Sequence, residues 1–441
     1  MSGRTFSDSD VLIVGSGPGG STLARQLARE GLKVLLLERG YDHRQAWYYG
    51  THLGAMIYSD RRTFLFSQEG LSIIRPMMLG GATGMFCGSA ALPPDWMRDR
   101  YDLDLTADAK DVIAELGIGP LPESLRGESS TRIAMAARSL GYDWQPQAKF
   151  IRPARSDRFD CGSKCMLGCR CNAKWSAAEF ADEAAAAGAV LATGARVTRL
   201  VIQEGRCAGV EAVLNGARFQ AAARVVVLSA GGIGSPRILQ ASGIDGAGDG
   251  MAMDTTMLVY GFSKEGGAAH DPPMTWAWNN RELGVMFSTL VDPWLNYPVV
   301  MLQEGLRYPL TWPKWRRLLG VMVKLKDDLS GRLYPDGRIS KPLTSFDHER
   351  LSEAEEIGRR ILLEAGADPG EIFNTPLRGT HPSATVRVGE LLDANLAAEI
   401  PGLYVCDASV FPEALGQPTV LTIIALARRL ARHLKEFEFQ V

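Results

Sequence analysis

Residues 10–40, DVLIVGSGPGGSTLARQLAREGLKVLLLERG, constrain the fold more than any other part of the chain. The segment begins with the apolar run 11–14, as expected for a buried parallel strand. A glycine turn follows, and residues 21–30 then repeat apolar side chains at helical spacing. A second apolar strand, 34–37, ends at the acid Glu38. This order predicts a βαβ unit at the start of the chain.

The glycines of the turn, Gly15, Gly17 and Gly20, form the pattern G-x-G-x-x-G. In this pattern the first glycine permits the tight turn, the second lets a pyrophosphate approach, and the third lets helix and strand pack closely. Glu38 is placed to accept hydrogen bonds from an adenosine ribose. The segment therefore predicts dinucleotide binding. Because the pattern occurs once and at the amino terminus, a tightly held FAD is favoured over NAD.

Charge and hydropathy exclude several other classes of protein. The 441 residues carry a formal net charge of −2, which offers no general attraction to nucleic acid. No apolar run reaches the roughly 18–20 residues that span a bilayer. The polar start, MSGRTFSDSD, leads straight into the first strand and does not resemble a secretory signal. We expect a cytoplasmic protein, although export with a signal-bearing partner stays open.

Three further stretches have the composition of turns and strands beside a cofactor. They are GGATG at 80–84, SAGGIGSP at 229–236 and LYVCDASVFP at 403–412. Asp407 ends a strand where it can contact the flavin ribityl or pyrophosphate region, or else cap a turn. Thr419 begins a helix whose free amides would favour the flavin edge that becomes negative on reduction.

Together these stretches resemble the glucose–methanol–choline (GMC) oxidoreductase family. The resemblance implies an α/β fold in which a Rossmann-like FAD-binding domain carries an inserted α+β substrate domain on an antiparallel sheet. The FAD-binding domain would comprise 1–250 and 376–441, including the cysteine-rich segment 161–171, and the substrate domain 251–375. The expected cofactor-binding residues are Gly15, Gly17, Gly20, Glu38, Gly80, Gly81, Thr83, Gly84, Val197, Asp407, Ala408, Pro418 and Thr419.

The resemblance also indicates the residues of the reaction. His381, in GTHPSATVRVG, matches the family segment that carries the active-site base, and its alternative is a structural loop histidine. A histidine that titrates near neutral pH suits removal of a hydroxyl proton. Gln417 stands where the family usually has a second His or Asn. A glutamine can orient substrate but cannot act as a base.

Four cysteines lie close together in DCGSKCMLGCRCNAKWS, at positions 161, 165, 169 and 171. Their spacing is neither that of a zinc ribbon nor that of a bacterial ferredoxin. The stretch resembles the C-x-x-x-C…GAK segment of GMC dehydrogenases that carry a three-iron cluster. That resemblance implies an iron–sulfur cluster on Cys161, Cys165 and Cys169, with Cys171 as a fourth ligand of a four-iron form. Zinc, reduced thiols and a disulfide stay open.

The leading hypothesis is an FAD-dependent dehydrogenase that oxidises a hydroxyl group of a small molecule. Its electrons would pass through the cluster to a cytochrome, a quinone or a small electron-transfer subunit. The alternatives are a reductase of a carbonyl or activated double bond, and an electron-transfer subunit of a larger complex. Five tryptophans and several basic residues between 276 and 317 suggest peripheral membrane or partner contact, or aromatic packing within a sheet.

Overall fold

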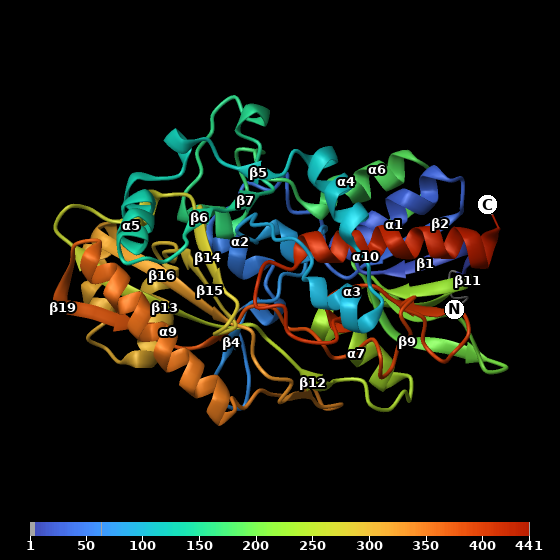
Figure 1. Cartoon of the computed structure of the whole chain (residues 1–441). Coiled ribbons are helices and arrows are strands. Elements are labelled where there is room, and N and C mark those ends of the chain that lie inside the picture. The colour runs from blue at the N-terminus through green and yellow to red at the C-terminus, as the bar shows by residue number, and fades with distance from the viewer. Residues whose placement is uncertain (1–4, 63, 441) are drawn as a thin grey trace.

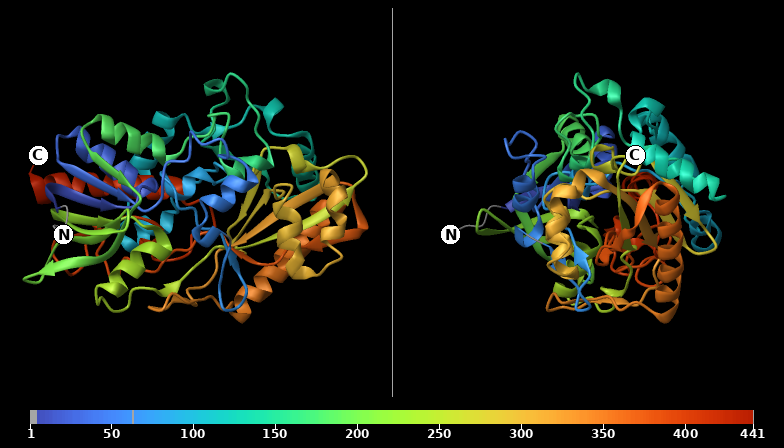
Figure 2. Two further views of the ribbon diagram at one scale, coloured as in Figure 1. Left: turned by 180° about the vertical axis from the view of Figure 1, so that it is seen from behind. Right: turned by 90° about the vertical axis from the view of Figure 1, so that its left-hand side faces the viewer.

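The computed structural model describes residues 5–62 and 64–440. Two β-sheets stand side by side along an elongated molecule, and helices cover their outer faces (Figures 1 and 2). The first strand and the last long helix lie together at one end (Figure 1). The second sheet forms the other end, and the loops between the sheets come from several distant parts of the chain.

The first sheet has seven described strands in the order β8-β2-β1-β11-β10-β9, with β21 also paired to β11. Strands β8, β2, β1, β11 and β21 run parallel, whereas β10 and β9 are antiparallel additions. This is the predicted Rossmann-like arrangement. The bounds are β1 (Thr5–Val14), β2 (Val34–Glu38), β8 (Val190–Thr193), β9 (Ala195–Gln203), β10 (Arg206–Leu214), β11 (Ala217–Leu228) and β21 (Leu403–Val405).

The helices of this half pack against the sheet through apolar faces. The run 11–14 is buried in β1, as its composition predicts, and it belongs to one core with the apolar residues of the helices. Figure 1 shows the last long helix, α10, lying alongside α1. The bounds are α1 (Pro18–Arg29), α4 (Thr106–Leu116), α6 (Ala177–Ala186), α7 (Gly231–Ala241) and α10 (Val420–His433).

The second sheet has nine described strands in the order β3-β4-β20-β13-β16-β15-β14-β6, with β19 also paired to β13. Its central pairs are antiparallel, which confirms the predicted type of substrate sheet. The bounds are β3 (Leu65–Phe66), β4 (Ser72–Ile73), β6 (Gln145–Pro146), β13 (Thr255–Ser263), β14 (Trp276–Asn280), β15 (Val285–Thr289), β16 (Leu318–Leu325), β19 (Ala367–Asn374) and β20 (Arg378–Gly379).

One face of the second sheet packs against α5 (Glu128–Ser139) and α9 (Ser345–Glu364) in a core of its own. Strands β3, β4 and β6 and helix α5 come from the first 250 residues. The second sheet therefore draws on more of the chain than 251–375. Among the described residues, no helix is long and apolar enough to cross a membrane.

The remaining helices and strands are short. They are α2 (His52–Ile57), α3 (Asp95–Tyr101), α8 (Asn296–Met301), β5 (Gly119–Pro120), β7 (Ala148–Lys149), β12 (Asp249–Met251), β17 (Gly331–Leu333) and β18 (Ile339–Ser340). Two small sheets, β12-β17-β18 and β5-β7, lie among them.

The third glycine of the motif generates a stability prediction. A Cβ on Gly20 would lie 2.0 Å from the carbonyl oxygen of Gly15, so Gly20→Ala must push α1 away from β1. We expect a loss of about 1–3 kcal/mol in the free energy of unfolding, measured by urea denaturation. Gly119→Ala is the control, because its Cβ would meet no atom within 4 Å. Equal stability of the two variants would contradict the proposed packing.

Candidate active site

Three glycine turns meet at the edge where the parallel strands of the first sheet end. The turn after β1 holds Gly15 at a φ of 101°, and Gly231 begins α7 at a φ of 78°. A Cβ on Gly81 in the third turn would lie 3.0 Å from the Cα of Gly17. Because open α/β sheets bind ligands at this edge, the three stretches form one candidate cofactor site.

Glu38 accepts hydrogen bonds from the turn after β1 and from a residue that follows β2. Its Oε2 accepts hydrogen bonds from the amide and hydroxyl of Ser16, at 2.8 and 2.7 Å, and its Oε1 accepts one from Gly40. The Ser16 hydroxyl in turn accepts a hydrogen bond from the Gly80 amide at 3.0 Å. Each carboxylate oxygen can accept further bonds. The ribose contact of Glu38 stays a prediction.

The residues at this edge fit a dinucleotide. Backbone rather than side chain is presented at Gly17 and Gly81, which are half-buried, and Ala82 beside them is exposed. Thr83 is buried and donates to the carbonyl of Gly80, which holds the turn 80–84 in its 3₁₀ form. The predicted residues Ala408, Pro418 and Thr419 follow β21 and lead into α10, at the same edge.

The carboxylate of Asp407 accepts hydrogen bonds from other residues of the protein. The donors are the amide of Gly231 at 2.8 Å, the hydroxyl of Ser235 and the amide of Ser409. Burial raises the pKa of Asp407, and these donors oppose that rise. The capping alternative is therefore what the structure shows. Its contact with the cofactor stays a prediction, as does that of Val197, which lies on the outer strand β9.

His381 forms a pair with an acid that the sequence analysis did not single out. Its Nδ1 lies 2.7 Å from the Oδ2 of Asp254, which is fully buried. A carboxylate can only accept, so Nδ1 carries the hydrogen and Nε2 of the neutral ring is left as an acceptor. The other oxygen, Oδ1, accepts a hydrogen bond from the Gly416 amide at 2.8 Å. This fixes the carboxylate against the loop before α10.

Burial lowers the pKa of His381, the charge of Lys324 lowers it further, and the bond to Asp254 acts in the opposite direction. Asp254 itself adopts a φ of 46°, a conformation that L-residues other than glycine rarely take. Such strain clusters at functional sites. An acid at the end of the apolar stretch 251–253, and a lysine within the apolar strand 318–325, were the sequence signals for these two residues.

Gln417 is buried and held on both sides. Its Nε2 donates to the carbonyl of Leu92 at 2.7 Å, and its Oε1 accepts from the side chain of Asn279 at 3.2 Å. Asn279 lies on β14 of the second sheet, so this contact links the two halves. The side chain is thus rigidly positioned, and its role toward substrate stays a prediction.

The four cysteines of the segment 161–171 form two pairs. The thiol of Cys161 hydrogen-bonds Cys165, which with Lys174 and Lys149 nearby lowers the pKa of Cys165 despite its burial. Cys169 and Cys171 have their sulfur atoms 3.7 Å apart. Within residues 5–62 and 64–440, no group of three or more His, Cys, Asp or Glu side chains is arranged to hold a metal ion. The predicted iron–sulfur ligand set is therefore not supported.

Two buried lysines hold the residues that follow the turn 80–84, and one of them, Lys174, also binds the cysteine segment. The ammonium of Lys174 donates to the carbonyls of Phe86 at 2.6 Å and Cys165 at 2.9 Å. The ammonium of Lys149 donates to the carbonyl of Cys87 at 2.7 Å. Burial raises the pKa of Cys87 to about 11, so its thiol is protonated at neutral pH. Lys174 therefore connects the cysteine segment to the residues that follow the turn 80–84.

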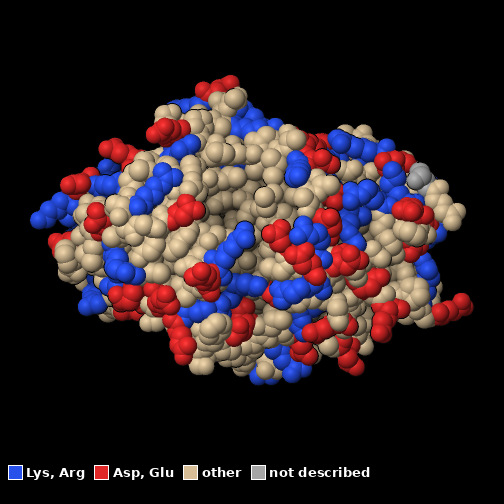
Figure 3. Space-filling model, viewed as in Figure 1, with Lys and Arg blue, Asp and Glu red and all other residues tan. Residues whose placement is uncertain are grey.

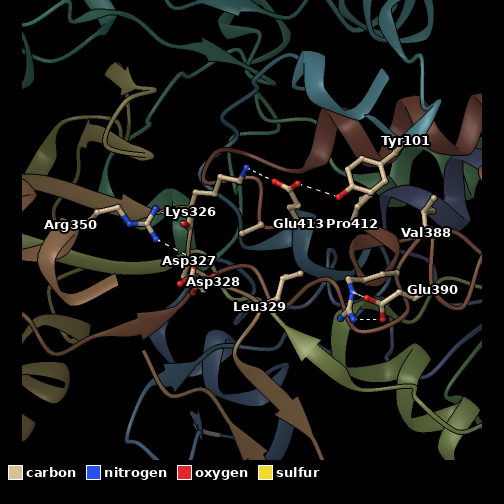
Figure 4. Close-up of a pocket in the computed structure, with 13 residues that line it drawn as sticks. Tyr101, Lys326, Asp327, Asp328, Leu329, Arg350, Val388, Glu390, Pro412 and Glu413 are labelled. Atoms are coloured by element: carbon tan, nitrogen blue, oxygen red, sulfur yellow. Dashed lines mark hydrogen bonds and ion pairs between the residues drawn. The ribbon is translucent and has the colours of Figure 1, made fainter. Parts of the chain in front are cut away.

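A separate polar cavity of about 550 Å³ opens near the loop that precedes α10 (Figure 4). Glu413 lies between Lys326 and Tyr101 and contacts both, at 2.7 and 3.2 Å (Figure 4). None of the predicted site residues lines this cavity. Figure 3 shows acidic and basic side chains interspersed over one face of the molecule, in keeping with the low net charge.

Comparison with known proteins now decides the family. The GMC oxidoreductase amino-terminal and carboxy-terminal family profiles match residues 95–253 and 347–427, and an NAD(P)-binding Rossmann-like domain profile matches residues 13–43. This chain belongs to the GMC oxidoreductase family. The resemblance noted in the sequence is thus confirmed, and the chain is an enzyme of the oxidoreductase class.

Several relatives align over much of this GMC oxidoreductase. An uncharacterised protein of Methanocaldococcus jannaschii is 26% identical, over 96% of this chain and 99% of its own length. A long-chain-alcohol oxidase of Arabidopsis thaliana is 24% identical, over 95% of this chain and 66% of its own length. A 2-methyl-1,2-propanediol dehydrogenase of Mycolicibacterium austroafricanum is 27% identical, over 55% of this chain and 52% of its own.

Solved structures confirm the fold. A pyridoxine 4-oxidase from Mesorbium loti covers 97% of this chain and 99% of its own, with a TM-score of 0.74 and 18% identity. A formate oxidase covers 100% of this chain and 99% of its own, with a TM-score of 0.72 and 15% identity. At such identities the likeness concerns the arrangement of the chain alone.

The paired arrangement of the cysteines generates a prediction about metal content. Protein purified without oxygen should contain substoichiometric iron and acid-labile sulfide, because the two thiol pairs do not converge on one point. Elemental analysis and a sulfide assay measure both. Stoichiometric iron with matching sulfide, lost in Cys165→Ser but retained in Cys207→Ser, would show that the segment rearranges around a cluster.

Proposed function

We propose that this GMC oxidoreductase is an FAD-dependent enzyme that oxidises a hydroxyl group of a small organic molecule. The observation that carries the proposal is the pair of His381 and Asp254, placed where the second sheet meets the carboxyl edge of the first. The alcohol-oxidising relatives support this reaction class. FAD, when bound, would accept the hydride that leaves the substrate carbon.

His381 would act as the base. Its Nε2 accepts the hydroxyl proton as the O–H bond breaks, and the electron pair of that bond stays on the oxygen and becomes part of the carbonyl. Asp254 fixes the ring through Nδ1 and stabilises the imidazolium that results. Since burial and Lys324 lower the pKa of His381, the ring is neutral and ready to accept a proton at neutral pH.

Gln417 would orient the substrate oxygen without exchanging protons. Its contacts with Leu92 and Asn279 restrict the amide to one position, which is what orientation requires. Substituting Gln417 should therefore weaken substrate positioning without moving the pH dependence of the reaction.

The reduced cofactor must pass its electrons to an acceptor. We propose a cytochrome, a quinone or a small electron-transfer subunit for this role, and a cytoplasmic location for the enzyme. The paired cysteines do not support an iron–sulfur relay, so no electron-transfer step is assigned to them. Reduction of a carbonyl or activated double bond stays a second hypothesis without a specific observation in its favour.

Replacing the base tests the proposal directly. His381→Asn should lower the rate of anaerobic flavin reduction by about 10²–10⁴-fold, because among the described residues no other histidine contacts Asp254. The rate is measured by stopped-flow absorbance with a panel of alcohols and diols. His348→Asn, at an exposed position on α9, is the matched control. The base assignment fails if His381→Asn binds FAD and keeps the full rate.

Removing the charge of the acid tests how the base is held. The side-chain amide of Asp254→Asn can donate to Nδ1 and so turn the ring to the wrong tautomer, which lowers the rate by about 10²-fold or more. The same stopped-flow assay measures the rate, and bound-FAD absorbance together with thermal unfolding establishes that the variant is folded. A folded Asp254→Asn variant with an unchanged rate would remove Asp254 from the reaction.

A further inference from the structure

Lys324 is the penultimate residue of β16, in a strand whose other residues carry no polar side chain. Its register partners are Thr256 on β13 and Met286 on β15. The adjacent residues Val323 and Leu325 point to the core formed with α9. Because side chains alternate along a strand, Lys324 points to the opposite face, where Thr256 and Thr380 contact its ammonium. A lysine is therefore built into the face of the substrate sheet that looks onto the candidate active site.

The ammonium of Lys324 is held by hydroxyl groups. Its Nζ donates to the Oγ1 of Thr256 at 3.2 Å and to the Oγ1 of Thr380, the residue before His381. Among the described residues it forms no ion pair. The Thr380 hydroxyl also contacts the carbonyl of Asp254 at 2.9 Å. The cation thus reaches both members of the His–Asp pair through one threonine.

Few charged or titratable groups act on His381 and Lys324. Asp254, before β13, and Lys324, on β16, act on His381. Asp254, Asp327 and the thiol of Cys87 act on Lys324. The loop before α10 contributes the neutral amide of Gly416 to Asp254. Burial lowers the pKa of Lys324 to about 8, so the side chain is largely protonated at neutral pH.

We propose that Lys324 is a positioning residue of the reaction site, a fixed buried cation that keeps His381 in its neutral, proton-accepting form and holds Thr380 and Asp254 in place. This inference rests on the proposed function, since it concerns the base of that reaction. A like charge close to a histidine disfavours the imidazolium, whereas the carboxylate of Asp254 favours it. Lys324 therefore offsets the effect of Asp254 on the base.

The test compares four variants, Lys324→Met, Lys324→Gln, Lys324→Arg and Lys314→Met, with the native enzyme. Lys314 is the control, because it lies near the surface and pairs with Glu371. Titration of the His381 ring is followed by NMR of histidine-labelled holoenzyme, with the signal assigned through His381→Asn. Loss of the charge in the Met and Gln variants should raise the pKa of His381 by about one unit. Lys324→Arg and Lys314→Met should leave it in place.

The pH dependence of the reaction rate should show the same change in the pKa of His381. Since only neutral His381 accepts the proton, the anaerobic reduction rate falls as pH drops through its pKa. The acid limb of the profile should move up by about one unit in Lys324→Met and Lys324→Gln. Below that limb their rate relative to the plateau falls by up to about tenfold. In Lys324→Arg the acid limb should stay at its native position, because the positive charge is retained. If Lys324 only supported the structure, the position of the limb would not follow the charge.

The native enzyme also tests the proposal without any substitution. Loss of the Lys324 proton near pH 8 should shift the His381 signal a second time, and Lys324→Arg should lack that step. The proposal is overturned if the His381 signal lacks the second step. It is also overturned if that signal titrates at the native pH in Lys324→Met or Lys324→Gln. If the NMR shifts occur but no hydroxylated compound reduces the flavin, the proposed function fails while the role of Lys324 toward His381 stands.

Discussion

The close backbone packing between α1 and the strand ends is the constraint on which the site depends. A Cβ on Gly19 would lie 2.0 Å from the carbonyl oxygen of Cys406, and one on Gly20 equally close to that of Gly15. Only glycine lets the helix approach two strands this closely. The start of α1 is consequently fixed against the ends of β1 and β21, which are the first and the last strand in the sequence. Turns from opposite ends of the sequence can then meet at one edge.

The reaction site is assembled across the boundary between the two sheets. Asp254 shares its carboxylate between His381 and the amide of Gly416, so one buried acid joins the entrance of β13 to the loop before α10. Lys324 contributes from the end of β16, and Asn279 of β14 holds Gln417. The contacts of Asp254 with Gly416 and of Asn279 with Gln417 each join the second half to the loop before α10. The relative placement of the sheets is therefore part of the chemistry, and a change that shifts one sheet should disturb the base before it disturbs either core.

Local pattern was enough to predict the parts of the fold that depend on local interactions. The motif around Gly15 and the helix that begins after Thr419 both follow from residues close in sequence, and the structure contains them. Asp254 and Lys324 were missed because their importance comes from register and from contacts between distant segments. Asp407 shows the same limit in another form, since its position was predicted but its hydrogen-bond partners come from α7.

The cysteine segment illustrates how a motif can be placed correctly while its chemistry depends on geometry. Spacing alone brings four thiols near one another, but a metal needs at least three of them directed at one point. Among the described residues no three of the thiols are arranged in this way, and the ammonium of Lys174 binds the carbonyls of Cys165 and Phe86. These hydrogen bonds give the segment a defined position without any metal, because a buried ammonium satisfied by carbonyl oxygens fixes the backbone that supplies them. Through Lys174, the segment supports the backbone of the loop that carries Cys87.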